Sequence, residues 1–136
     1  MATTSVAQRN IEIARKGYAA FNDADIETVL ALLSDDVLWH GGPKGPMAGD
    51  YKGKDAVMEL FMKFGQLTEG SYKADIHDIL ADDEHTVVIG VSTATRKGVK
   101  REDKFVDVIH PDADGKVKEF WRFFEDAFGA VEWLEA

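Results

Sequence analysis

Hydrophobic positions in the first part of the chain recur with the spacing of helices. From about Val6 to Asn22 the apolar side chains come every three or four residues, which predicts an amphipathic helix. Asp25 then has the character of an N-cap, and it starts a second, shorter helix. The residues that this second helix is expected to carry inward are Ile26, Val29, Leu30 and Leu33.

A third helical pattern follows a segment that is rich in glycine and proline. Val37 to His40 is a short strand candidate, and the breakers between Gly41 and Gly49 predict a loop after it. From Lys54 to Phe64 the apolar residues again fall on one side of a helix. The sequence therefore predicts three helices before the middle of the chain.

The remainder of the chain has the β-branched and aromatic content of strands. The expected strands are Tyr72 to Leu80, Thr86 to Arg96, Glu102 to His110 and Val117 to Asp126. Short polar turns separate them, so consecutive strands should pair antiparallel. We therefore expect an α+β fold over residues 1–136, a single domain in which three N-terminal helices pack on a curved antiparallel sheet. The other face of that sheet must be solvated or covered by a partner, and a homodimer through it is expected.

Composition narrows the function classes. A chain of 136 residues supports one hydrophobic core, and its formal charge of −9 argues against a nucleic-acid partner. It has no cysteine, which excludes disulfides and thiolate chemistry. No stretch reaches the roughly 20 apolar residues of a membrane span, and the first residues do not resemble a signal peptide. We therefore expect a cytoplasmic protein that does not bind membranes.

Two segments carry a resemblance to a known family. The run from Tyr18 to Ile26, followed by Leu32 to Val37, resembles the opening helices of the ketosteroid isomerases and the SnoaL-like polyketide cyclases. The run from Asp114 to Trp121 is similar to the turn and last strand of the same families. Both families have the nuclear transport factor two-like fold. The resemblance thus implies a cone-shaped sheet that encloses a pocket for a small hydrophobic molecule.

The same resemblance places particular residues at the site. Gly17 and Gly41 stand where the isomerases carry an oxyanion-binding tyrosine and a carboxylate base, so the resemblance argues against steroid isomerisation. Asp107 stands where the isomerases place a second acidic donor and the cyclases a catalytic histidine. Arg122 replaces an aspartate of the cyclases, which argues against their aldol reaction.

Four polar residues are candidates for catalysis. If Asp107 and Arg122 face the pocket, they form either a polar clamp for substrate or a structural ion pair. His40 is the candidate general base, because an unperturbed histidine has a pKa of about 6.5. Strand alternation allows only one of Trp39 and His40 to face the pocket, and the alternative for His40 is a surface position. Tyr18 is either a hydrogen-bond donor or a core residue.

A large set of apolar side chains fits a pocket wall and fits a plain core equally well. This set consists of Trp39, Phe21, Leu60, Phe61, Phe64, Phe105, Phe120 and Phe124. The segment from Gly42 to Asp50 is a candidate lid. Histidine and acidic residues form no recognisable ligand motif, so neither a metal nor a cofactor is expected.

These observations favour an enzyme that acts on a small hydrophobic ligand by acid–base chemistry without a cofactor. An isomerase, cyclase, lyase or hydrolase reaction would fit. Two alternatives remain open, a binding or carrier domain that uses the same pocket without turnover, and a dimeric interaction module that uses the outer face of the sheet.

Overall fold

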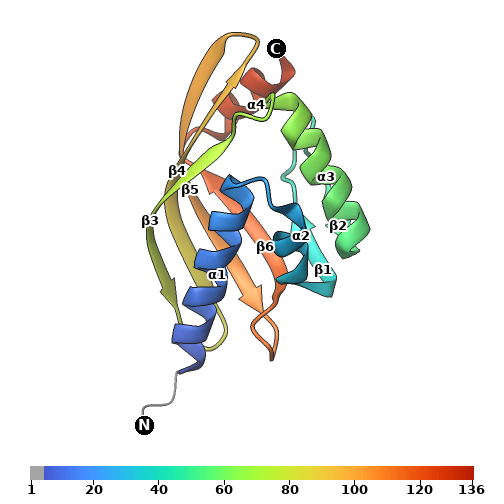
Figure 1. Cartoon of the computed structure of the whole chain (residues 1–136). Coiled ribbons are helices and arrows are strands. Elements are labelled where there is room, and N and C mark those ends of the chain that lie inside the picture. Colours follow the sequence, from blue (N-terminus) through green and yellow to red (C-terminus); the bar gives the residue numbers. More distant parts are fainter. Residues whose placement is uncertain (1–4) are drawn as a thin grey trace.

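The computed structural model describes residues 5–136, and Figure 1 shows the helices and strands of that range. The helices are α1 (Val6–Asn22), α2 (Ile26–Ala31), α3 (Gly53–Leu67) and α4 (Ala127–Glu135). The strands are β1 (Leu33–His40), β2 (Asp50–Lys52), β3 (Lys73–Ala81), β4 (Thr86–Arg96), β5 (Val99–Pro111) and β6 (Val117–Phe124). Over this range no helix combines the length and the apolar character that crossing a membrane requires.

The strands form one sheet in the order β2-β1-β6-β5-β4-β3. Strands β3 to β6 pair antiparallel with their neighbours in sequence, as their short turns predict. Strand β1, however, pairs parallel with β6, with Trp39 opposite Phe120. The expectation of a wholly antiparallel sheet is therefore wrong, and the sheet is mixed. Turns determine only the pairing of successive strands, whereas β1 and β6 are brought together by the packing of the helices.

The three N-terminal helices cover one face of the curved sheet, which confirms the α+β architecture (Figure 1). Helix α1 lies along β3 and β4, and α3 packs on β1 and β2. The first helix starts with a capping box, in which Ser5 accepts from the Gln8 backbone N–H at 3.1 Å and the Gln8 side chain accepts in return. This helix has the boundaries that its apolar spacing predicts.

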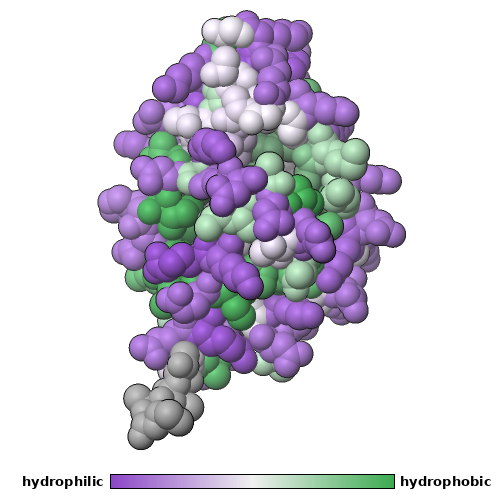
Figure 2. Space-filling model, viewed as in Figure 1, coloured by the Kyte–Doolittle hydropathy of each residue, from purple (hydrophilic) through white to green (hydrophobic). Residues whose placement is uncertain are grey.

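The core consists of two neighbouring clusters of apolar side chains. One cluster joins α1, α2 and α3 to β1, and its centre is Val37 and Val57, which are completely buried. The other lies between α1 and the long strands around Val88. Trp39 packs against both clusters and connects them. Figure 2 shows that hydrophilic side chains surround the hydrophobic ones on the helix-bearing face.

Three local expectations need correction. Leu33 was expected in the second helix but begins β1, where it is 2% exposed, because the backbone N–H of Val117 on β6 donates to Leu32 O at 2.9 Å. Asp50 was expected in the loop but begins β2. The last strand was expected to reach Asp126, but it ends at Phe124. Asp126 instead caps α4, a helix that the sequence reading did not anticipate.

A buried polar cluster as the candidate site

The ladder between β5 and β6 places Asp107 directly opposite Arg122. Because side chains alternate between the two faces of a strand, Asp107 and Arg122 lie on the same face as the buried Phe105 and Phe120. This is the face that the helices cover. The two ionisable candidates therefore both point to the interior, as the family resemblance implies.

Four polar side chains meet there, and we name them the interior cluster: Tyr18, Tyr72, Asp107 and Arg122. Arg122 binds Asp107 with two hydrogen bonds, from Nε to Oδ1 at 2.7 Å and from Nη2 to Oδ2 at 2.8 Å. Tyr18, on α1, donates its hydroxyl to the same Oδ2. Tyr72, which precedes β3, accepts from Arg122 Nη1 at 2.6 Å. A single chain of hydrogen bonds thus connects four distant segments.

Burial is uneven within the interior cluster. Asp107 is completely buried, whereas 18% of the Arg122 side chain is exposed. The guanidinium carbon of Arg122 lies 3.9 Å from the centroid of the Phe105 ring, which is a favourable cation–π position. Asp107 is therefore shielded from solvent completely, whereas part of the Arg122 side chain is not.

The electrostatics follow from burial and from the ion pair. Burial raises the pKa of Tyr18 well above its ordinary value, and the nearby Asp107 carboxylate raises it further. Burial also raises the pKa of Tyr72, but here Arg122 opposes the increase. For Arg122 itself, burial lowers the pKa, and the charge of Asp107 more than offsets this so that the pKa ends well above its ordinary value. Tyr18 thus contacts the carboxylate of the ion pair, and Tyr72 contacts its guanidinium.

The apolar candidates line the interior next to the cluster. Trp39 stacks on Phe120 at a centroid distance of 3.7 Å, and Phe61 meets Trp39 edge-on at 5.1 Å. Phe21 and Phe64 meet the Tyr72 ring at 5.6 and 4.9 Å. These contacts, together with buried Leu60 and Phe105 and partly buried Phe124, agree with a wall and with a core alike.

His40 is not part of this cluster. It follows Trp39 on β1 and lies on the opposite face, where it stacks on Trp121 at 4.8 Å. Its Nδ1 is 2.8 Å from Asp50 Oδ1 and its Nε2 is 2.7 Å from Glu119 Oε2. The structure therefore does not bring His40 to Asp107. From the outer face, His40 is not positioned to act as the base of an interior site.

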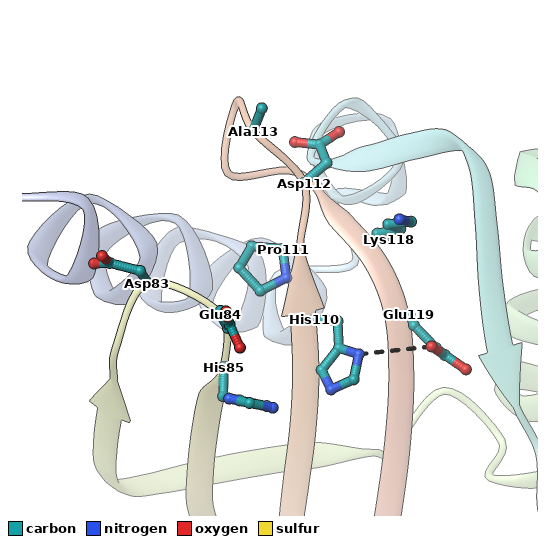
Figure 3. Close-up of a pocket in the computed structure, with 9 residues that line it drawn as sticks. All are labelled: Asp83, Glu84, His85, His110, Pro111, Asp112, Ala113, Lys118 and Glu119. Carbon is teal, nitrogen blue, oxygen red and sulfur yellow. Dashed lines mark ion pairs between the residues drawn. The ribbon is translucent and has the colours of Figure 1, made fainter.

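His110 lies on the same outer face, with Nδ1 3.6 Å from Glu119 Oε1. Together, His40, Asp50, Glu119 and His110 form a group that we name the outer cluster. An open surface hollow of about 470 Å³ adjoins it and is lined in part by His85, His110 and Glu119 (Figure 3). A second hollow, of about 510 Å³, lies beside α1. Neither hollow is lined by an interior-cluster residue, so the enclosed pocket stays a prediction.

Tyr72 is the site residue that the sequence reading missed. It was expected only to begin a strand, and no motif surrounds it. Its partner Arg122 is separated from it by 50 positions in the sequence. The proximity of the two side chains depends on the curvature of the sheet, which no local pattern encodes. Within residues 5–136, no group of three or more histidine and acidic side chains is arranged to hold a metal ion.

Comparison with known proteins identifies the family. A family model of the SnoaL-like domain matches residues 14–120. The chain belongs to the SnoaL-like family. Among solved structures, it is similar to Bal32a from a soil-derived mobile gene cassette, with 30% identity and a TM-score of 0.90 over 96% of this chain and 99% of that one.

Two further structures support the nuclear transport factor two-like fold. An NTF2-like protein of unknown function from Burkholderia pseudomallei shares 26% identity, with a TM-score of 0.80 over 93% of this chain and 98% of that one. TerC, co-crystallised with polyporic acid, shares 26% identity, with a TM-score of 0.79 over the same fractions. No curated protein is significantly similar in sequence to this SnoaL-like chain.

Proposed function

We propose that this SnoaL-like protein is an enzyme that acts on a small hydrophobic molecule by acid–base chemistry, without a cofactor. The observation that carries the proposal is the interior cluster, a buried ion pair with a phenol hydroxyl at each end and aromatic rings beside it. The similar protein TerC was co-crystallised with polyporic acid, which is consistent with an organic ligand for this chain. An isomerase, cyclase, lyase or hydrolase reaction fits this chemistry.

The carboxylate end of the cluster provides the base. Tyr18 already donates its proton to Asp107, so its oxygen can accept a proton from the substrate while its own proton moves to Asp107. After this transfer Tyr18 is again a neutral phenol, Asp107 is a neutral acid, and the substrate carries the negative charge. Arg122 holds Asp107 in position through two hydrogen bonds and stays charged throughout.

The proposal is tested by binding and turnover with small ring compounds, beginning with polyporic acid. We expect calorimetry to detect one binding site per chain, and we expect Asp107→Asn to reduce turnover by at least about 100-fold, the range for loss of a general base. Binding without turnover by the wild type would instead favour the carrier alternative. Turnover unchanged in Asp107→Asn would contradict the assigned base.

We also propose that a second copy of the chain covers the outer face of the sheet. On that face Phe123 is 56% exposed and Ile89 is 37% exposed, and partly exposed Val106, Val108 and Trp121 lie between or beside them. Large apolar side chains in such an arrangement are typical of association surfaces. Sedimentation should give twice the 15.1 kDa of one chain, and Phe123→Lys should shift the protein towards monomer. A monomeric wild type would contradict the proposal.

A further inference from the structure

His85 and His110 stand opposite each other at the end of the ladder between β4 and β5. The antiparallel register pairs Thr86 with Ile109, so the residue before Thr86 meets the residue after Ile109. The centroids of the two imidazole rings lie 4.9 Å apart, at an interplanar angle of 73°. Figure 3 shows the two rings pointing toward each other. Strand pairing thus brings together two histidines that no sequence motif connects.

A carboxylate lies beside the Nδ1 atom of each ring. Asp82 Oδ1 is 3.5 Å from His85 Nδ1, and Glu119 Oε1 is 3.6 Å from His110 Nδ1. Such a neighbour favours the tautomer in which Nδ1 carries the proton, and Nε2 then presents a lone pair. Among the hydrogen bonds of residues 5–136, the only imidazole nitrogens in use are those of His40. The Nε2 atoms of His85 and His110 are therefore available to a ligand.

The spacing of the two rings fits a metal ion between them. A zinc ion lies about 2.0–2.1 Å from an imidazole nitrogen, and that nitrogen lies about 1.1 Å from the centre of its ring. Two imidazoles on one tetrahedral zinc ion therefore have ring centroids about 5 Å apart. The centroid distance of 4.9 Å between His85 and His110 matches this value. A carboxylate on the other ring nitrogen is also typical of histidines that bind a metal.

Neighbouring contacts hold both histidines in place. Asp82 Oδ1 accepts from the backbone N–H of Glu84 at 2.8 Å and from that of His85 at 2.7 Å, which fixes the turn before β4. His110 belongs to β5, and its ring meets the Trp121 ring edge-on at 4.9 Å. A pair of ligands that is already in position loses little conformational entropy when it binds an ion.

The surroundings of the pair are open and acidic. The side chains of His85 and His110 are 48% and 39% exposed, and both line the hollow of about 470 Å³. The charged side chains that share this lining are Asp83, Glu84, Asp112, Lys118 and Glu119. Four carboxylates and one ammonium group, on a chain with a formal charge of −9, attract cations to this hollow.

We propose that His85 and His110 bind one divalent transition-metal ion, of the class that includes Zn²⁺, Ni²⁺ and Cu²⁺, through their Nε2 atoms. Imidazole nitrogen suits these ions, whereas Mg²⁺ and Ca²⁺ prefer oxygen. In residues 5–136 no larger group of histidine and acidic side chains is arranged around a metal, so water completes the coordination. The bound ion links β4 to β5 and stabilises the folded chain by mass action.

This inference departs from the sequence prediction of no metal. That prediction depended on the absence of a ligand motif, and the two histidines come together only through the pairing of two strands. The proposed site lies on the outer face of the sheet, and it does not depend on the function proposed for the interior cluster.

Calorimetric titration of the full chain with Zn²⁺ and with Ni²⁺ tests the site, and no cysteine competes for these ions. We expect one site per chain. His85→Gln and His110→Gln should each weaken binding by at least about tenfold, because losing even a residue that only orients a ligand costs about 10–100-fold in affinity. His77→Gln is the matched control, because it removes another exposed histidine, on β3, and it should leave the affinity unchanged.

A second measurement identifies the ligands without a substitution. In protein with nitrogen-15 in its histidine rings, a trace of paramagnetic Cu²⁺ should broaden the ring signals of His85 and His110 and leave those of His77 sharp. Excess Mg²⁺ should not displace Zn²⁺ from the protein, because it prefers oxygen ligands. Displacement by Mg²⁺ would mean that the acidic side chains, and not the imidazoles, bind the ion.

The outcomes decide the proposal without reference to catalysis. Weaker binding in both His85→Gln and His110→Gln, with unchanged binding in His77→Gln, supports the site. A wild type that binds neither Zn²⁺ nor Ni²⁺ would overturn it, and so would an affinity that falls in only one of the two variants or in neither. In each of these cases the function proposed for the interior cluster still stands.

Discussion

The interior and outer clusters occupy the same ladder of the sheet, yet they differ in almost every physical respect. Asp107 faces Arg122, and three positions along β5 His110 faces Glu119. The first pair points to the helices and the second points away from them. Side chains alternate between the two faces of a strand, and Asp107 and His110 are three residues apart, so they lie on opposite faces. This alternation alone places one acid–base pair in the interior and the other at the surface.

Solvent access explains why the two clusters differ. Asp107 is completely buried, and its bonds to Arg122 are 2.7 and 2.8 Å long. The Glu119 side chain is 27% exposed and that of His110 is 39% exposed, and His110 Nδ1 is 3.6 Å from Glu119 Oε1. Water screens the outer pair, so removing either partner should change the free energy of unfolding little. A buried charge that loses its partner should lower the free energy of unfolding strongly.

The largest effect should follow from breaking the interior ion pair. Arg122→Met leaves Asp107 buried without a counter-charge, which should reduce the free energy of unfolding by about 3–5 kcal/mol. The matched outer change, Glu119→Gln, should cost less than about 1 kcal/mol. Urea unfolding measures both. If Arg122→Met lowered the free energy of unfolding as little as Glu119→Gln, water would have to reach the Asp107 carboxylate. The double variant Asp107→Asn with Arg122→Met should recover part of the loss.

A smaller loss of stability should follow from crowding the Phe105 ring, which packs against the Arg122 guanidinium. Gly90 lies opposite Phe105, and a Cβ atom at Gly90 would come within 2.7 Å of Phe105 Cζ and 2.8 Å of Asp75 O. Gly90→Ala should therefore reduce the free energy of unfolding by about 1–3 kcal/mol, because the ring that supports Arg122 must move.

Gly65 provides the control for this prediction. It lies in α3, and a Cβ atom there would meet nothing within 4 Å. Gly65→Ala should stabilise the protein by about 0.5–1 kcal/mol, because alanine favours a helix interior over glycine. Equal effects of the two glycine substitutions in urea unfolding would contradict the tight packing around Phe105.

The smallest effect should be the pH dependence of the outer cluster. Partial burial alone would lower the pKa of His40, but its hydrogen bonds to Glu119 and Asp50 raise it above 6.5. The stability that this adds is fully present below pH 6.5 and is lost as the pH rises through the higher folded value.

We therefore expect wild-type protein to exceed His40→Gln in stability by less than about 1 kcal/mol at mildly acidic pH, and the difference to shrink towards pH 8. Thermal unfolding at several pH values measures this. A difference that grows with rising pH would mean that the hydrogen bonds do not favour the charged imidazole.

Much of the fold followed from local patterns, while the pairing of distant segments did not. The spacing from Val6 to Asn22 and the short polar turns predicted α1 and the meander from β3 to β6 correctly. The parallel pairing of β1 with β6 and the strand position of Leu33 were not predicted. In both cases a contact between remote segments overrides the local apolar pattern.

Helix α4 could have been predicted. Asp126 is followed by Ala130 and Leu134 at helical spacing, and Asp126 accepts from the Gly129 backbone N–H at 2.9 Å as an N-cap does. The expected last strand extended to Asp126, and no element was expected after it. No comparable sequence pattern predicts that Tyr72 belongs to the interior cluster. A single tyrosine before a strand is not part of any periodic pattern.

The sequence alone determined the α+β fold class and the order of most elements, because alternation and spacing act within a few residues. Asp107 and Arg122 became candidates through the family resemblance. Only the tertiary structure decided that Trp39 faces the interior and His40 the outside, and that Tyr18 and Tyr72 occupy opposite ends of one ion pair. Those facts depend on how the sheet curves over α1, and curvature arises from the packing of all elements together.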